Sequence, residues 1–359
     1  MQTGGPIRVL IVHDSPRWYA ALAGALGAQS GIRVCEAAAS AHALGARILA
    51  AHPDAVVIDL ALPEPVAVPI LRNLREHYPV PIFACSSGRR DRTPALSAIE
   101  HGVLDVVIKP RGLGRGPWRR LAADLAQRLR AAIRHARPVG LLAGEGSRRP
   151  ALSFRKAGID PRRHLMVVGA STGGPEALRE LLGALPADAP PVAIVQHMPA
   201  MFTGPFAERL DAAGVLSVGE AREGDPLAPG RVLVARGDTH LTVRRGGAGW
   251  FAHYTDQRRV NLHCPSVDVL FDSAVAAAGA AAIGVLLTGM GDDGARGLLR
   301  LHECGALTAA QDPRSCVVDG MPKVARELGA ADVVAAPADL PARLIEALVQ
   351  RKEVAAAFR

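Results

Sequence analysis

Several features that mark other classes of protein are missing from this sequence. No apolar run approaches the roughly 20 residues that a helix needs to span a bilayer, so we expect no membrane insertion. The first residues, Met-Gln-Thr-Gly-Gly-Pro, lack a charged segment followed by an apolar one, so we expect no export signal. The five cysteines are scattered and form no Cys-x-x-Cys pair. That pattern is more typical of a reduced cytoplasm than of a disulfide framework or a zinc site.

Lysine is scarce, although the formal net charge of +8 raises the question of nucleic-acid binding. Four of the 42 basic residues are lysines, and Ala, Gly and Pro are abundant, which indicates a global compositional bias and not a binding face. The sequence has no aromatic interleaving of the basic residues and no recognition-helix motif. We therefore expect no nucleic-acid partner.

The length of 359 residues suits two domains. In the first part, short apolar runs alternate with Ala/Leu/Arg stretches of helical spacing, which predicts a (βα)5 array. The runs are 8–12, 55–59, 81–85 and 105–109, and the last helical stretch covers 118–137. We assign residues 6–137 to this domain. The stretch 138–161, rich in Gly, Ser, Pro and Arg without a period, is predicted to be a linker.

The second part, residues 162–355, has a βα pattern with one interruption. Near-continuous apolar runs separated by helical stretches are typical of parallel strands buried on both faces. Residues 241–244 and 250–254 alternate across a Gly-rich turn, which predicts an antiparallel hairpin. A helix is expected over 340–354. The predicted fold class is α/β: a (βα)5 domain, then a doubly wound parallel-sheet domain with an inserted antiparallel hairpin.

Three apolar runs in the second part end in polar residues suited to acyl transfer. They lead into Ser171, His197 and the acidic pair Asp292 and Asp293. In an open parallel sheet, ligands bind beyond the carboxyl ends of the strands. If the runs are such strands, one sheet edge holds a candidate nucleophile, a general base and its orienting acid.

Ser171 lies in Gly-Ala-Ser-Thr-Gly, which matches the G-x-S-x-G turn between a strand and a helix. Gly174, Pro175 and Glu176 suit the first turn of that helix, whose free amides are able to steady a developing oxyanion. A phosphate-binding loop is the alternative. It is disfavoured because G-x-G-x-x-G is missing and Pro175 stands where such a loop needs Lys.

The base and the acid are harder to choose. A histidine usually packs in the interior, and this chain has twelve, but His197 differs in lying at the end of a strand and before Met-Pro. Asp292 and Asp293 are adjacent, so only one can face the imidazole, and Gly-rich turns attract Asp for turn geometry alone. The order Ser, His, Asp differs from that of α/β-hydrolases, which disfavours an ordinary esterase or lipase.

Together these motifs resemble the chemotaxis protein-glutamate methylesterases of the CheB family. The resemblance covers the second half of the chain and rests on several motifs in the same order. They are Gly-Ala-Ser171-Thr-Gly-Gly, Gln-His197-Met-Pro, Cys264-Pro-Ser-Val-Asp-Val-Leu-Phe, Thr-Gly-Met290-Gly-Asp-Asp293-Gly, Ala310-Gln-Asp and Ser315-Cys-Val-Val-Asp-Gly-Met-Pro.

The resemblance implies a role for each residue: Ser171 as nucleophile, His197 as base and Asp293 as orienting acid. Thr172 and the Met290 backbone would support the site and its oxyanion. The implied substrate is a glutamate γ-methyl ester on the cytoplasmic helices of methyl-accepting chemotaxis receptors, hydrolysed to glutamate and methanol. The family also deamidates specific receptor glutamines. Catalysis would need no cofactor, and the enzyme would be cytoplasmic.

The family also carries an N-terminal receiver domain, which residues 8–137 resemble. By position, Asp59 is the phospho-acceptor, Ser86 the hydroxyl that senses the phosphoryl group and Lys109 its counter-charge. Asp14 and Asp59 are the candidate Mg²⁺ ligands. The implied partner is a histidine kinase of the chemotaxis type.

Several receiver features are missing. His13 stands where the family has the first acid of an Asp-Asp pair, the loop after Asp59 lacks Asp-Gly, and Val106 replaces an aromatic switch residue. Losing a carboxylate weakens a Mg²⁺ site. Two hypotheses stay open: a phosphorylated regulator, or a docking or oligomerisation domain that kept the fold and lost the switch. The rival for the whole chain is a signalling scaffold with an inactive second domain, which the intact Ser, His and Asp disfavour.

Overall fold

The chain divides into two units, Met1–Leu142 and Ala143–Arg359, each described here by itself. The computed structural model describes residues 5–13, 15–38, 51–62, 64–78, 80–88, 98, 101–135, 152–247 and 249–357. Asp14 of the predicted receiver site lies outside these residues. Among the described helices, none combines the length and apolar character needed to cross a membrane.

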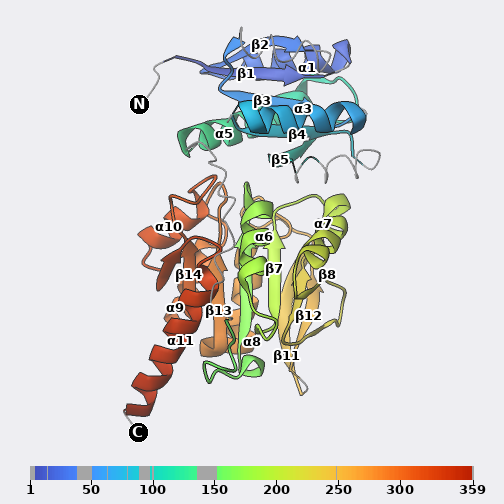
Figure 1. The fold of residues 1–359 in the computed structure, drawn as a ribbon. Helices are drawn as coiled ribbons and strands as arrows, with labels where there is room; N and C mark the ends of the chain where they lie inside the picture. The colour runs from blue at the N-terminus through green and yellow to red at the C-terminus, as the bar shows by residue number, and fades with distance from the viewer. Residues whose placement is uncertain are drawn as a thin grey trace. The chain divides into compact units, whose positions relative to one another are not determined.

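The first unit is built on a five-stranded parallel sheet of order β2-β1-β3-β4-β5 (Figure 1). Its apolar runs become strands because each is buried between helices on both faces. The strands are β1 (Ile7–Val12), β2 (Ile32–Ala38), β3 (Ala55–Asp59), β4 (Ile82–Ser86) and β5 (Val103–Ile108). The predicted (βα)5 pattern is therefore confirmed, and the edge strand β2 is added to the predicted runs.

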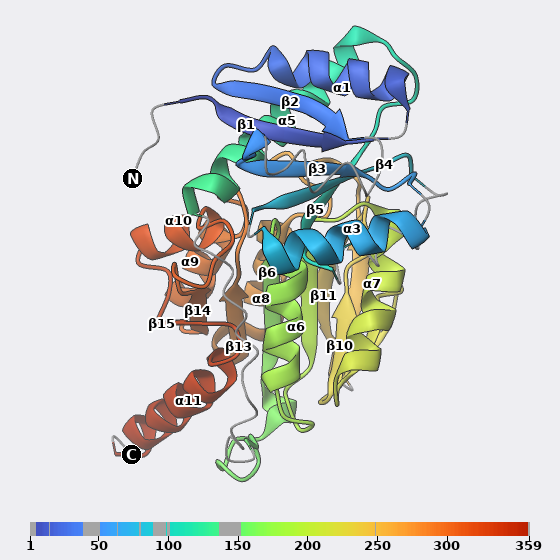
Figure 2. The same ribbon diagram turned by 45° about the horizontal axis from the view of Figure 1, so that its top comes forward.

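Helices cover both faces of this sheet. α1 (Pro16–Gly27) and α5 (Arg115–His135) pack on one face, where Leu22, Leu26, Leu125 and Leu129 join the buried core. α3 (Glu64–His77) lies on the opposite face (Figure 2). The helical spacing of residues 118–137 thus corresponds to the buried stripe of α5.

The second unit is built on a seven-stranded sheet of order β15-β14-β13-β6-β7-β10-β8, with every neighbouring pair parallel. Strand β6 therefore lies between β7 and β13. The strands that follow it in sequence are added first on its β7 side and then on its β13 side. Such a point of reversal is where open α/β sheets bind ligands. The strands are β6 (Leu165–Ala170), β7 (Val192–Gln196), β8 (Ser217–Glu220), β10 (Arg231–Val234), β13 (Ala282–Leu286), β14 (Leu307–Gln311) and β15 (Val333–Ala335).

Helices flank this sheet as well (Figure 1). One face carries α6 and α7, and the other packs against α8 and α9 through a core that includes Val167, Leu270, Phe271 and Leu298. The helices are α6 (Gly174–Ala184), α7 (Ala200–Ala213), α8 (Val267–Ala278), α9 (Ala295–Glu303), α10 (Met321–Glu327) and α11 (Leu340–Ala357), with short 3-10 turns at Pro161–Arg163 and Gly279–Ala281.

The predicted antiparallel hairpin is present. β11 (His240–Gly246) pairs with β12 (Gly249–Thr255), with Val243 opposite Ala252, and β9 (Pro226–Leu227) completes a three-stranded sheet. The inner side chains of the hairpin join the core beside α8, which explains why its residues alternate between apolar and polar.

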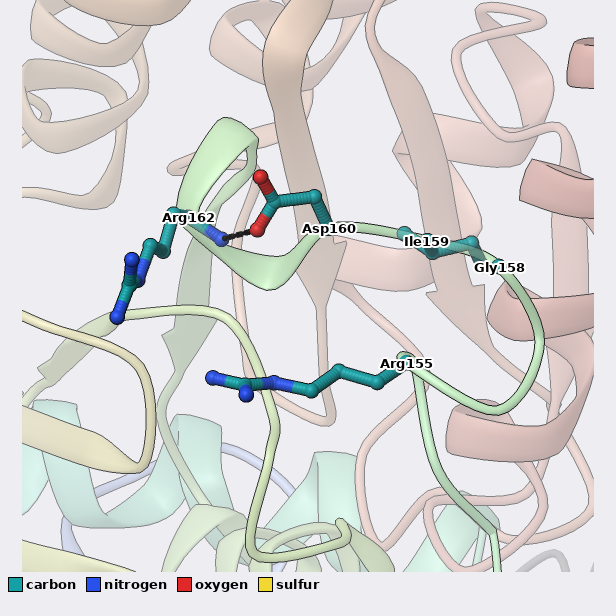
Figure 3. Close-up of a pocket in the computed structure, with 5 residues that line it drawn as sticks. All are labelled: Arg155, Gly158, Ile159, Asp160 and Arg162. Atoms are coloured by element: carbon teal, nitrogen blue, oxygen red, sulfur yellow. Dashed lines mark hydrogen bonds between the residues drawn. The ribbon is translucent and has the colours of Figure 1, made fainter.

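The end of the predicted linker is folded. Phe154 is fully buried, and its backbone N–H, with the Ser153 hydroxyl, donates to the carboxylate of Asp188. Residues 152–161 thus belong to the second unit, because a buried aromatic ring and a paired carboxylate hold them. Nearby, a shallow pocket lies at the amino end of β6 (Figure 3). It is lined by Arg155, Gly158, Ile159, Asp160 and Arg162.

Candidate active site

Ser171 and His197 stand at the carboxyl edge of the second sheet. They follow β6 and β7 directly, and these strands pair with Ala170 opposite Gln196. The His197 N–H donates to the Ala170 carbonyl at 3.0 Å, which continues the ladder past the last paired residues. Neighbouring strands lie about 4.8 Å apart, so the register brings the two residues side by side.

Gln196 holds the two segments together, and sequence reasoning gave it no role. Its buried amide nitrogen donates to the carbonyls of Ser171 at 3.0 Å and His197 at 3.2 Å. Gly174 makes room for it, since a Cβ there would lie 2.0 Å from the Gln196 Oε1. The signal in the sequence was the polar residue closing an otherwise apolar strand.

The turn after Ser171 is tightly constrained. Gly173 has φ 79° and caps α6, and a Cβ at this position would lie 2.5 Å from the Val317 Cβ. A residue with a side chain is thus excluded by both backbone conformation and space. Pro175 and Glu176 occupy the first turn of α6 as expected. Ser171 is consequently held beside the amino end of a helix, where the dipole favours negative charge.

Thr288, two residues beyond β13, ties the Ser171 loop to a third segment. Its carbonyl accepts from the Ser171 N–H at 3.0 Å, and its hydroxyl donates to the Thr172 carbonyl at 3.0 Å. Gln311 accepts from the Thr288 N–H at 2.7 Å. Thr172 is therefore buried and fixed through its main chain, while Met290 lies two residues beyond Thr288 and is half-buried.

His197 is paired with Asp293. The His197 Nε2 lies 2.8 Å from the Asp293 Oδ2, and the carboxylate is buried, with its side chain 1% exposed. Asp292 is exposed, and its carbonyl accepts from the Ala295 N–H, as the turn alternative expects. Of the two adjacent acids, the structure thus brings Asp293 to the imidazole.

Further donors surround the Asp293 carboxylate. Oδ1 accepts from the Ser266 hydroxyl at 2.7 Å and the Asn261 amide at 2.8 Å, and Oδ2 accepts from the Val267 N–H at 2.7 Å. Burial alone raises the pKa of Asp293, but the hydrogen bond and charge of His197, with the other donors, more than offset it and lower the pKa below its ordinary value. Asp293 is therefore ionised at neutral pH.

The segment before α8 was the largest omission of the sequence reasoning. Asn261 and Ser266 have no role in the sequence analysis, and His263 is one of the histidines that lack the combination of features that marks His197, a strand end followed by Met-Pro. The rings of His263 and His197 are stacked, with centroids 3.7 Å apart and planes at 5°. His240, also set aside, accepts from the Ser266 N–H at 3.1 Å. The Cys-Pro-Ser-Val-Asp motif at 264–268 was the available signal.

In the first unit, Asp59 ends β3 and is buried between two basic side chains. Lys109 Nζ lies 2.6 Å from the Asp59 Oδ1, and His13 Nε2 lies 2.6 Å from the Oδ2. Burial raises the pKa of Asp59, but the contacts with His13 and Lys109 outweigh burial and lower it. Ser86 ends the neighbouring strand β4, and its carbonyl accepts from the Lys109 N–H. The structure thus brings three of the four predicted receiver residues together.

The described residues around Asp59 supply few ligands for a Mg²⁺ ion. Both carboxylate oxygens of Asp59 already face a basic side chain, and the His13 ring approaches the carboxylate from the position where the family has an acid. Among the residues that the structure describes, no group of three or more His, Cys, Asp or Glu side chains is arranged to hold a metal. Hard cations need several oxygen ligands, and here the His13 imidazole offers a nitrogen where an oxygen ligand would be needed.

The fold and the sites define a class of protein: a receiver-like unit followed by a parallel α/β unit with Ser, His and Asp at one sheet edge. Two family models match, "CheB methylesterase" over residues 166–344 and "Response regulator receiver domain" over 9–115. The chain belongs to the CheB family.

Relatives of known name match nearly the whole chain. Protein-glutamate methylesterase/protein-glutamine glutaminase 5 of Anaeromyxobacter dehalogenans is 43% identical and covers 95% of this chain and 96% of its own. Number 1 of the same organism is 46% identical over 90% of this chain and 94% of its own. The CheB methylesterase catalytic domain of Thermotoga maritima is 38% identical with a TM-score of 0.50, over 51% of this chain and 97% of that one.

Asp293→Asn is expected to lower the free energy of unfolding by about 2–4 kcal/mol, because an amide cannot accept from all the surrounding donors. Asp292→Asn, the exposed control, is expected to stay within about 0.5 kcal/mol. The measurement is urea unfolding followed by circular dichroism. Because the pKa of Asp293 is lowered on folding, its stabilisation is present above the ordinary aspartate pKa of about 3.9 and is lost as pH falls through the native value. The gap between parent and variant should shrink on acidification; equal losses in the two variants would contradict this account.

His13→Asp is expected to strengthen Mg²⁺ binding, because it replaces a ring nitrogen by carboxylate oxygens beside Asp59. Tryptophan fluorescence offers the readout. Lys109 contacts Asp59, and its Nζ also lies 5.4 Å from the Trp18 ring centroid, so an ion that displaces Lys109 would change the surroundings of Trp18. His52→Asp, at an exposed histidine of the same unit, is the control. A Mg²⁺-dependent change of equal size in the parent would show that His13 does not exclude the ion.

Proposed function

We propose that this chain is a protein-glutamate methylesterase and protein-glutamine glutaminase that acts through Ser171, His197 and Asp293. The observation that carries the proposal is the buried His197–Asp293 pair at the sheet edge next to Ser171. A buried charge costs free energy unless it is well paired. Here the buried carboxylate contacts an imidazole, and the imidazole lies next to a serine at the start of a helix. This is the arrangement of an activated nucleophile.

The base would act through Nδ1 of His197. Its Nε2 faces Asp293, while the buried Nδ1 has no hydrogen-bond partner among the residues that the structure describes. With the proton on Nε2 held by the carboxylate, Nδ1 carries the lone pair that takes the proton from the Ser171 hydroxyl. The Asp293 charge then stabilises the imidazolium, and its low pKa keeps it from removing that proton for itself.

The reaction follows in two balanced steps. Ser171 Oγ attacks the γ-carbonyl carbon of the glutamate methyl ester, and the tetrahedral intermediate collapses as His197 returns the proton to the departing methoxide, which leaves as methanol. Water, deprotonated by the same histidine, then hydrolyses the acyl-enzyme to glutamate and free serine. With a glutamine side chain, ammonia leaves in place of methanol. The amides that follow Ser171 at the start of α6, Thr172 and the Met290 backbone would steady the oxyanion. No metal or organic cofactor is assigned to this chemistry.

The substrate and partners that we propose follow from the relatives. Their names specify protein glutamates and glutamines, and the receiver family match implies a kinase partner. We assign the substrate residues to the cytoplasmic helices of methyl-accepting chemotaxis receptors, the kinase to the chemotaxis type and the enzyme to the cytoplasm. The receiver unit is proposed to regulate access to Ser171, with Asp59 as its acceptor. We expect the His13 contact to make that acceptor hard to phosphorylate, because a ring nitrogen stands where the supporting cation needs oxygen ligands.

Ser171→Ala is expected to abolish methanol release from methylated receptor membranes while leaving the unfolding transition unchanged, since the hydroxyl is the proposed nucleophile. Ser217→Ala, at an exposed serine of β8, is the matched control. Asp293→Asn should lower kcat by about 10³- to 10⁴-fold, as loss of the orienting acid does in other serine hydrolases, and Asp292→Asn should have little effect. Methanol release by Ser171→Ala at the parent rate would refute the serine mechanism.

A fragment that begins at residue 152 is expected to release methanol faster than the full chain at rest. The reason is that a tethered receiver unit competes with a receptor helix for access to Ser171. The fragment must include residues 152–161, since Phe154 is part of the core of the second unit. Initial rates are compared for both proteins with and without Mg²⁺ and a small phosphodonor. Phosphodonor activation should be weak in the parent and stronger in His13→Asp. Equal resting rates for the two proteins would remove inhibition by the receiver.

A further inference from the structure

The turn Val260–His263 presents two side chains to the His197–Asp293 pair. Val260 and His263 close the turn through two backbone hydrogen bonds, from Val260 N–H to the His263 carbonyl at 3.0 Å and from His263 N–H to the Val260 carbonyl at 2.8 Å. Asn261 has φ 50° and Leu262 has φ 69°. Positive φ at both central residues is the signature of a tight type I′ turn.

The backbone of this turn is costly for its sequence. Asn adopts the left-handed region readily, but Leu does so rarely, and the Leu262 side chain is 83% exposed, so packing does not explain its conformation. Strained residues of this kind persist where the surroundings determine them. Here the determining contacts are made by the residues on either side, Asn261 and His263.

Asn261 joins two carboxylates. Its amide nitrogen lies 2.8 Å from the Asp293 Oδ1 and 2.6 Å from the Asp268 Oδ2, so the two hydrogens of one NH₂ group serve two acids. Asp268 also accepts from the Gly297 N–H at 2.6 Å. This bridge fixes the turn to the amino end of α8 and to the acid behind the imidazole at the same time.

His263 fixes the imidazole itself. Its ring is parallel to that of His197, with centroids 3.7 Å apart. A hydrogen bond at Nε2 holds one atom of the His197 ring but permits the ring to tilt about that bond, whereas a flat ring against its face opposes the tilt. The stacking and the Asp293 contact together define where Nδ1 points.

We propose that His263 is a positioning residue for the reaction, held in place by the turn that Asn261 anchors. The inference rests on the proposed function, because it assigns His197 the role of base. His263 acts by the flat surface of its ring: it keeps the His197 lone pair directed toward the serine hydroxyl. Misplacement of a reacting group by about 1 Å is enough to cost up to a hundredfold in rate.

The test compares four single variants in the full chain. His263→Ala is expected to lower kcat about tenfold or more, with KM changed less than about twofold, since ring orientation matters to the chemical step. His263→Phe keeps a flat ring without an imidazole, so it should recover most of the lost kcat. Asn261→Ala should resemble His263→Ala. Leu262→Asn, at the exposed position between them, is the control and should keep the parent kcat.

A second readout separates this inference from the proposed function. A fluorophosphonate probe labels a serine that is activated by its base, and mass spectrometry locates the label. Failure to label Ser171 in the parent would refute the serine mechanism itself. Labelling of Ser171 in the parent and at an equal rate in His263→Ala would refute the positioning role alone. Equal kcat losses in His263→Phe and His263→Ala would also refute it, because stacking would then not be the property that matters.

Discussion

The second unit depends on one buried carboxylate. Asp293 is shielded from water, so its charge must be balanced by donors brought to it from the protein. Those donors come from separate parts of the chain: an imidazole after β7, a hydroxyl and an amide at the start of α8, and the side chain of Asn261. Satisfying one charge therefore fixes the relative positions of three segments, and the position of the His197 imidazole with them.

The parallel sheet supplies the rest of the arrangement. Strand β6 lies between β7 and β13, so the residue that follows it has neighbours from both directions. Ser171 is tied to the His197 segment through Gln196 and to the β13 segment through Thr288. Because these hydrogen bonds involve the main chain, they position the serine independently of its own hydroxyl. That leaves the hydroxyl for chemistry.

The first unit balances a buried carboxylate in a different way. Asp59 sits between Lys109 and His13, and each of its carboxylate oxygens contacts one of these side chains. Receiver units normally use a divalent ion to neutralise this cluster and to assist phosphoryl transfer. Here His13 and Lys109 both contact the carboxylate directly.

Much of the architecture followed from the sequence. Near-continuous apolar runs predicted the parallel strands, the helical spacing of 118–137 predicted α5, and the alternation at 241–254 predicted the hairpin. Each was predictable because burial of each face is recorded locally in the residue pattern. The edge strand β2 and the folded segment at Phe154 were missed. Both are stabilised by contacts with distant residues, which a local pattern does not record.

Some features of the candidate site were predictable from the sequence, and others depend on the tertiary structure. The sequence singled out Ser171 and His197 as candidates, since a polar residue at the end of an apolar strand is a local signal. The residues alone narrowed the acid to an adjacent pair, and the family resemblance implied Asp293. The physical reason for Asp293 over Asp292 lies in the tertiary structure, because it depends on which side chain faces the imidazole. The roles of Asn261 and His263 were decided only there as well. The Asn261 side chain contacts Asp293, 32 positions further along the chain, and the His263 ring stacks on His197, 66 positions earlier. Both residues belong to one turn, whose conformation is set by these tertiary contacts.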